Sequence, residues 1–206
     1  MPEQIQITLF TFDELSEESQ QRVIEPFREA YDPDYSVIYD EFINGMSVDY
    51  GAVIQVDDIQ WSGFWSQGDG ACFTCDFDTE VILPMLKEEL NEDQVALLKE
   101  IDAEIDCSSI RTGYQYSHEN TVRGKVSIYY GDTYYDRMVD INEIHDILEN
   151  KLTEIIREEC RNLYSELERF YDEEMEDEAI IQKLKEYSLL HLGACRYRED
   201  GTLFVR

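Results

Sequence analysis

The sequence predicts a mixed α+β fold, in which antiparallel hairpins form a sheet that packs against several helices. Hydrophobic residues recur at spacings of three and four towards both ends of the chain, whereas the middle is rich in β-branched and aromatic residues. With 206 residues, 43% of them hydrophobic, the chain can bury a sizeable core. We therefore expect one domain over residues 1–206, with a subdivision near residues 136–140 as the alternative.

The first predicted elements are a strand and two helices. Residues 4–12 alternate enough to form a strand, and Ser16 is placed to cap a helix that runs towards Tyr31. The first turn of this helix carries Glu17 and Glu18, where the helix dipole favours carboxylates. A second amphipathic helix is indicated by four residues at helical spacing, which are Tyr35, Ile38, Phe42 and Met46.

Two hairpins are predicted in the middle of the chain. The first pairs residues 52–64 with residues 71–77 across a loop that contains glycine. The second pairs residues 110–116 with residues 121–130, which are rich in Tyr, Val, Ile and Thr. Between the hairpins, a cap-like Asn-Glu-Asp-Gln sequence begins a helix over about residues 91–105.

The last third of the chain predicts a long acidic helix, with a kinked or broken helix as the alternative. A shorter helix is expected over residues 179–187. The chain then closes with a small hairpin, residues 195–197 and 202–205, around an Asp-Gly turn. One apolar face of the long helix is marked by Ile141, Ile144, Leu148, Leu152, Ile155, Leu163, Leu167 and Phe170.

Charge gives the strongest restriction on function. The chain has 47 acidic and 17 basic residues, a formal net charge of −30. Such a field repels the phosphates of DNA or RNA and an anionic membrane, so we expect no direct binding to nucleic acid or membrane. A protein with a basic surface is the natural partner, and the alternative is that the charge serves solubility alone.

Cysteine use and hydropathy favour a cytoplasmic protein. The five cysteines are an odd number, and the first residues lack the basic flank of a secretory leader. No apolar run approaches the roughly 18 to 20 residues that a membrane-spanning helix needs. We therefore expect reduced thiols in the cytoplasm.

A glycine-rich loop in the first hairpin is a candidate ligand site. Its glycines permit unusual backbone angles around an aspartate, so the loop is able to offer amides to an anion or a carboxylate to a cation. It lacks the lysine and the hydroxyl residue of a Walker A motif, and a structural turn is the competing interpretation. The loop consists of Trp65, Ser66, Gln67, Gly68, Asp69 and Gly70.

Other chemistry-bearing residues give weaker signals. Cys72 and Cys75 have the spacing of a zinc or redox pair, but no second pair accompanies them, and residues three apart on a strand face opposite ways. The three histidines, His118, His145 and His191, fall in different predicted elements. Residues 172–178 are acidic but lack the glycine and alternation of an EF-hand loop. We predict no catalytic residue, no metal site and no cofactor.

Acidic residues off the apolar face of the long helix form the predicted partner-binding surface. Residues one turn apart on a helix are about 5 to 6 Å apart, a spacing comparable with that of phosphates along a nucleic-acid strand. The alternative is an ordinary solvated helix face with intrahelical ion pairs. The predicted surface comprises Glu154, Glu158, Glu159, Glu166, Glu168, Asp172, Glu173, Glu174, Glu176 and Asp177.

Four short segments resemble a family of uncharacterised proteins encoded by bacteriophages. They read FDELSEE at residues 12–18, GFWSQGDGA at residues 63–71, YSHE at residues 116–119 and YREDG at residues 197–201. The second is the most specific of them. The resemblance implies a phage origin and action in the host bacterial cytoplasm, and it carries over no catalytic residue.

Charge and resemblance together favour a phage-encoded inhibitor of a host defence protein or other nucleic-acid-binding protein, acting by DNA or RNA mimicry. Small acidic phage proteins that imitate nucleic acid often block restriction enzymes or CRISPR effectors, as anti-restriction and anti-CRISPR proteins, and this comparison is one of analogy. The alternatives are a binding protein or enzyme for a nucleotide or signalling metabolite, which uses the glycine-rich loop, and a structural or assembly protein of the virion. A homodimer is an open alternative for the oligomeric state.

Overall fold

A computed structural model describes residues 7–113, 115–131, 134, 137–191 and 195–204. The mixed α+β class is confirmed. The chain divides into two compact units, unit 1 with Met1–Asp34 and Arg169–Arg206, and unit 2 with Tyr35–Glu168. A division into compact units does not show whether the two units unfold together. The single domain over residues 1–206 therefore stays a prediction. No helix among the described residues is long and apolar enough to cross a bilayer.

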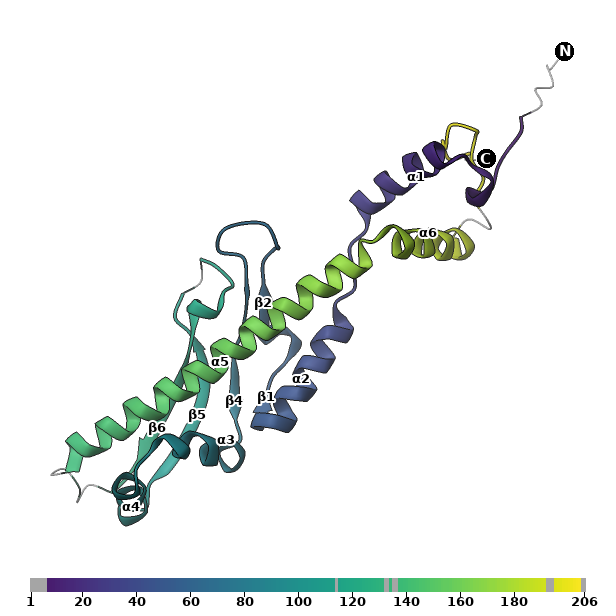
Figure 1. Cartoon of the computed structure of the whole chain (residues 1–206). Coiled ribbons are helices and arrows are strands. Elements are labelled where there is room, and N and C mark those ends of the chain that lie inside the picture. Colours follow the sequence, from purple (N-terminus) through teal and green to yellow (C-terminus); the bar gives the residue numbers. More distant parts are fainter. Residues whose placement is uncertain (1–6, 114, 132–133, 135–136, 192–194, 205–206) are drawn as a thin grey trace. The chain divides into compact units, whose positions relative to one another are not determined.

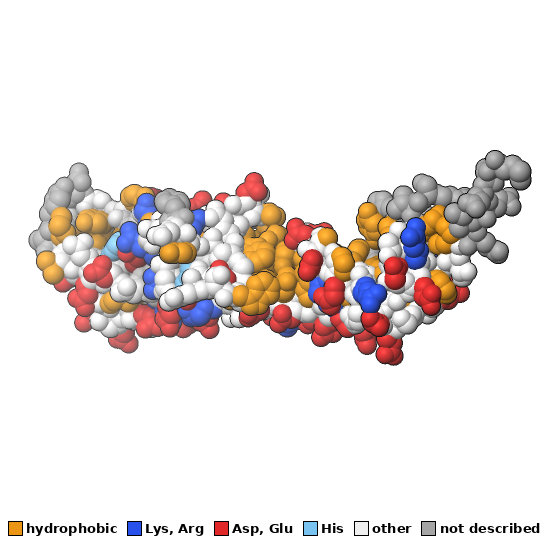
Figure 2. Space-filling view, turned by 90° about the horizontal axis from the view of Figure 1, so that it is seen from above, with side chains coloured by type: hydrophobic (Ala, Val, Ile, Leu, Met, Phe, Trp, Pro, Cys, Tyr) orange, Lys and Arg blue, Asp and Glu red, His pale blue; other side chains and the backbone are white. Residues whose placement is uncertain are grey.

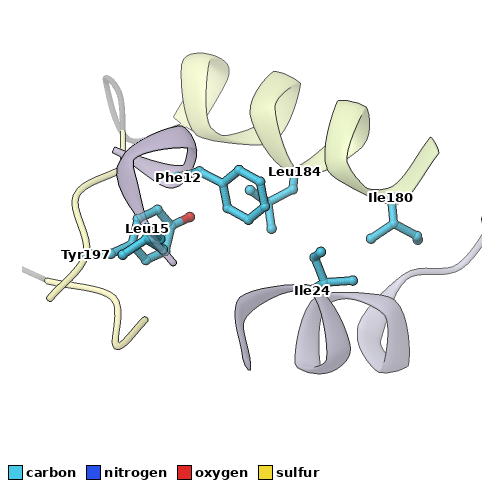
Figure 3. Packing of buried hydrophobic residues seen from close by; sticks show 6 residues of the cluster. All are labelled: Phe12, Leu15, Ile24, Ile180, Leu184 and Tyr197. Atoms are coloured by element: carbon cyan, nitrogen blue, oxygen red, sulfur yellow. The ribbon is translucent and has the colours of Figure 1, made fainter. Parts of the chain in front are cut away.

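Unit 1 is built around two helices, α1 (Glu17–Ala30) and α6 (Asp177–His191). The Ser16 hydroxyl accepts a hydrogen bond of 3.3 Å from the Ser19 amide, so the predicted cap of α1 is confirmed. Apolar side chains of both helices meet a short 3-10 helix, η1 (Phe12–Glu14), and the C-terminal segment. Figure 3 shows this core, which consists of Phe12, Leu15, Ile24, Ile180, Leu184 and Tyr197.

Both ends of the chain form less β structure than the sequence predicts. Residues 4–6 lie outside the described residues, and only Phe10 of the predicted first strand forms a bridge, with Tyr197. The strand stops because the Glu14 carboxylate accepts bonds from the amide and hydroxyl of Thr11 and closes a 3-10 turn instead. At the C-terminus the predicted hairpin forms, because the Arg198 amide donates to the Thr202 carbonyl at 2.9 Å and the Phe204 amide donates to the Arg196 carbonyl at 2.8 Å. Its β structure is short, with a bridge between Tyr197 and Leu203, and residue 205 lies outside the described residues.

Unit 2 contains two antiparallel sheets (Figure 1). The larger has the order β1-β4-β5-β6, and the smaller pairs β2 with β3. The predicted hairpin is therefore correct for β2 and β3, whereas residues 52–53 pair with β4 in the larger sheet. The strands are β1 (Ala52–Val53), β2 (Ile59–Trp61), β3 (Ala71–Phe73), β4 (Cys75–Phe77), β5 (Glu104–Arg111) and β6 (Val122–Tyr129).

Three shorter helices of unit 2 are α2 (Ser36–Tyr50), α3 (Thr79–Leu86) and α4 (Glu92–Glu100). Asn91 caps α4 as predicted, through a bond of 2.9 Å from the Gln94 amide. The predicted extent of this helix was wrong, because Asp102 takes a left-handed conformation with φ of 50°. The chain thus enters β5 several residues earlier than expected, and residues 112, 113, 115 and 116 follow the strand, while residue 114 lies outside the described residues.

The last long helix, α5 (Met138–Glu174), runs for 37 residues without the break that was the alternative. In unit 2 it crosses one face of the larger sheet (Figure 1). Gly124 of β6 allows the closest approach, since a Cβ there would lie 2.7 Å from Leu152 Cγ. The Gly124 amide donates to Thr153 Oγ1 at 3.0 Å, and His145 Nε2 lies 2.9 Å from the Val126 carbonyl oxygen. Packing and hydrogen bonds together fix the rotation of α5 about its axis.

This close approach predicts opposite effects for two glycine substitutions. Gly124→Ala would push α5 away from the sheet and lower the free energy of unfolding by about 1 to 3 kcal/mol. Gly45→Ala is the control, because a Cβ at Gly45 meets nothing within 4 Å and alanine favours a helix by about 0.5 to 1 kcal/mol. Urea denaturation measures both values. Equal values for the two variants would contradict the proposed contact.

Candidate functional site: the outer face of α5 and the Trp65 loop

The ten predicted partner-binding residues do not share one environment. Glu154, Glu158 and Glu168 are exposed, on the side of α5 away from its buried residues. Glu159 and Glu166 lie on a flank that faces α2. There Tyr50 donates to Glu159 Oε1 at 2.8 Å, and burial, followed by this bond, raises the pKa of Tyr50.

The remaining predicted residues belong to unit 1, where several serve internal packing. Glu174 is largely covered, since its side chain is 19% exposed, and it also accepts a bond from the Tyr31 hydroxyl. Asp172 and Glu176 are exposed. Three residues of this set form ion pairs, which are Glu173 with Arg169, Glu174 with Lys183 and Asp177 with Arg28.

Further exposed carboxylates that the sequence prediction did not include lie on the outer side of α5 in unit 2. Glu143 and Asp146 are exposed and continue the surface of Glu154 towards the start of the helix. The helical spacing in the sequence places Glu143 on the same side as Glu154, because Glu143 precedes Glu154 by three helical turns. We name this set the acidic row, and it consists of Glu143, Asp146, Glu154, Glu158 and Glu168.

The acidic row remains negative despite nearby bases. Lys151 pairs with Glu154 and with Glu89 of the same unit, and Arg161 is exposed on the same side of α5. Figure 2 shows acidic side chains mainly along the lower edge of the view, with lysine and arginine in fewer, separate places. Exposed pairs of this kind contribute little stability, so a stronger cationic partner is able to displace them.

The glycine-rich loop folds around its own aspartate. Asp69 Oδ2 accepts hydrogen bonds from the amides of Trp65, at 3.0 Å, and Ser66, at 2.6 Å. Gly68 has a φ of +97°, and a Cβ at Gly70 would lie 3.1 Å from the Ser117 carbonyl oxygen. The carboxylate and two amides are thus used within the loop, which favours the structural-turn interpretation of residues 65–70.

Aromatic side chains surround the Trp61–Phe64 end of this loop. The Trp61 ring stacks on Phe64 with centroids 5.1 Å apart, and its Nε1 donates to the Tyr39 hydroxyl at 2.7 Å. Phe64 also contacts Tyr164 of α5, whose hydroxyl donates to the Gly63 carbonyl at 3.1 Å. Trp65 itself is 77% exposed at the surface. The loop therefore presents a large aromatic side chain beside α5.

The histidines and cysteines belong to no three-residue metal cluster within the described part of the chain. No group of three His, Cys, Asp or Glu side chains there is arranged to hold a metal. Cys72 lies on β3 and Cys75 on β4, and burial raises the pKa of Cys75 to about 12. His118 caps the β5–β6 connection, and the side chain of His191 lies outside the described residues.

A family model described as a domain of unknown function, DUF8835, matches residues 34–177. The match covers all of unit 2, with the acidic row and the Trp65 loop. Most of unit 1 lies outside it. No curated protein and no solved structure matches the chain.

The hydrogen bonds of Asp69 predict how the loop responds to substitution. Asp69→Ala removes the acceptor of two amides, so the amides of Trp65 and Ser66 should exchange with solvent at least tenfold faster, a change of about 1.4 kcal/mol in protection. Asp69→Asn keeps an acceptor oxygen and should exchange almost as slowly as the native loop. Hydrogen exchange followed by NMR measures the rates. Unchanged exchange in the alanine variant would show that other contacts hold the loop.

Proposed function

The chain belongs to the DUF8835 family, and we propose that this member is a non-enzymatic inhibitor that binds the basic surface of a nucleic-acid-binding protein. The acidic row carries the proposal. It displays carboxylates on a helix whose rotation is fixed by the sheet behind it, so the charges have defined positions. A partner that normally holds phosphates presents lysine and arginine side chains to such a surface.

Mimicry of nucleic acid follows from the same geometry. Glu154 and Glu158 lie one turn apart, about 6 Å along the helix axis. A helix face on which carboxylates outnumber basic side chains resembles the charged backbone that a nucleic-acid cleft recognises without reading bases. The inhibitor would therefore occupy the cleft and exclude DNA or RNA.

The proposed setting is the cytoplasm of a bacterium infected by a phage. The resemblance of residues 12–18 and 63–71 to phage-encoded proteins supports this setting, and the net charge of −30 supports a basic host target. Nucleases of restriction or CRISPR systems combine both properties, because they must bind nucleic acid in that compartment. We propose a defence protein of this class as the partner.

Association should be fast and sensitive to salt. Exposed charges steer encounter, and salt screens them over about 8 Å at physiological ionic strength. The net charge attracts a basic partner at a distance, whereas the acidic row acts on the bound partner by contact. Two variants that lose the same number of charges from different surfaces therefore show how much the acidic row itself contributes to binding.

The test compares two variants that each lose three negative charges. Capture from bacterial lysate with the native protein supplies the partner, and titration calorimetry gives each dissociation constant. The first variant neutralises the acidic row with Glu154→Gln, Glu158→Gln and Glu168→Gln. The control neutralises the opposite face of the sheet with Asp76→Asn, Glu104→Gln and Asp106→Asn.

We expect the first variant to bind about tenfold more weakly, since each exposed pair contributes about 0.2 to 1 kcal/mol. The control should change binding less than about twofold, and DNA or RNA should compete with the native protein for the partner. Equal effects of the two variants would exclude the acidic row as the contact. Capture of no nucleic-acid-binding protein would contradict the proposed function itself.

A further inference from the structure

We propose that Trp65 is an aromatic contact for arginine, and that it selects a partner segment in which arginine rather than lysine lies beside the acidic row. This inference rests on the proposed function, because it names the chemistry of the same partner. Its starting observation is that a large aromatic side chain is 77% exposed at the surface of unit 2. Exposed tryptophan on a fixed loop is typical of a binding contact.

The loop holds Trp65 in place before any partner arrives. Asp69 accepts bonds from the Trp65 and Ser66 amides, and Ser62 donates to the Gly70 carbonyl at 3.0 Å across the loop base. The loop packs tightly on the β5–β6 connection, because a Cβ at Gly70 would lie 3.1 Å from the Cα of His118. An ordered loop loses little conformational entropy on binding, so the tryptophan is suited to act as an anchor.

The loop is also joined to the helix that carries the acidic row. The Tyr164 hydroxyl donates to the Gly63 carbonyl at 3.1 Å, and the Tyr164 ring contacts Phe64. Glu168 follows Tyr164 by one helical turn. Burial, and then the charges of Glu168 and Asp69, raise the pKa of Tyr164, so both carboxylates act on this part of the surface. The exposed Trp65 ring and the exposed Glu168 carboxylate therefore lie on connected elements and are available to one ligand, whereas the Asp69 carboxylate is used within the loop.

Arginine fits this combination better than the other ligands of an exposed tryptophan. A guanidinium group stacks on an indole ring and pairs with a carboxylate through two parallel hydrogen bonds, whereas an ammonium group is a compact, strongly hydrated charge. A nucleobase also stacks on tryptophan, but its phosphates would meet a protein with a net charge of −30. Charge complementarity thus selects the cation, and stacking selects arginine among cations.

The experiment uses two fluorescently labelled peptides of nine residues, one all arginine and one all lysine, which carry equal charge. Fluorescence anisotropy at low ionic strength gives the dissociation constant of each peptide for the full chain. Trp65→Leu keeps an apolar side chain but removes the aromatic face, and Trp65→Tyr keeps an aromatic face. The control is Tyr129→Leu, which removes an aromatic side chain, 54% exposed, from the outer face of β6.

The native protein should bind the arginine peptide more tightly than the lysine peptide. Trp65→Leu should weaken arginine binding about two- to fivefold, the range expected for an exposed cation–π contact, and reduce the preference. Trp65→Tyr and Tyr129→Leu should keep the preference for the arginine peptide. Unchanged thermal unfolding of Trp65→Leu will show that the loss is local.

Two outcomes separate this inference from the proposed function. Suppose that Trp65→Leu keeps the arginine preference, while neutralisation of Glu154, Glu158 and Glu168 weakens the binding of both peptides. The proposed role of Trp65 is then wrong, and the proposed role of the acidic row is supported. If the native protein binds neither peptide at low ionic strength, the proposed attraction to basic partners fails, and the arginine contact fails with it.

Discussion

The contact between α5 and the larger sheet determines most of what unit 2 presents to solvent. At Gly124 the helix lies so close to β6 that a single added methyl group would meet Leu152. The bond from the Gly124 amide to Thr153 fixes the rotation of the helix at the same level. Because the apolar face of α5 packs against the sheet, helical geometry directs Glu154 and Glu158 outward.

The same helix connects the acidic row with the Trp65 loop. Tyr164 joins α5 to the Trp65 loop, so an acidic surface and an exposed indole belong to connected elements of unit 2. A flexible acidic segment would also attract basic proteins, but it would lose conformational entropy on binding and discriminate little among them. The arrangement in unit 2 offers defined positions for a charged side chain and for a stacking partner.

Local chemistry in the sequence predicted the helices well, because their signals act over a few residues. Ser16 and Asn91 cap helices as expected, and periodicity located the buried face of α5. The predicted limits of α4 and β5 were wrong because one residue decided them: the left-handed Asp102 follows the end of α4, before residue 105. Contacts distant in sequence, such as that of Tyr50 with Glu159, engage some of the predicted carboxylates, and no local pattern in the sequence predicts such contacts.

Carboxyl footprinting of the complex tests the central claim most directly. In this measurement a carbodiimide couples an amine to exposed carboxylates, and mass spectrometry compares labelling of the free protein with that of the protein bound to its captured partner. We predict protection of Glu154, Glu158 and Glu168, with Asp76 and Asp106 labelled equally in both states. Protection of Asp76 and Asp106 with full labelling of α5 would place the partner on the opposite face of the sheet and contradict this account.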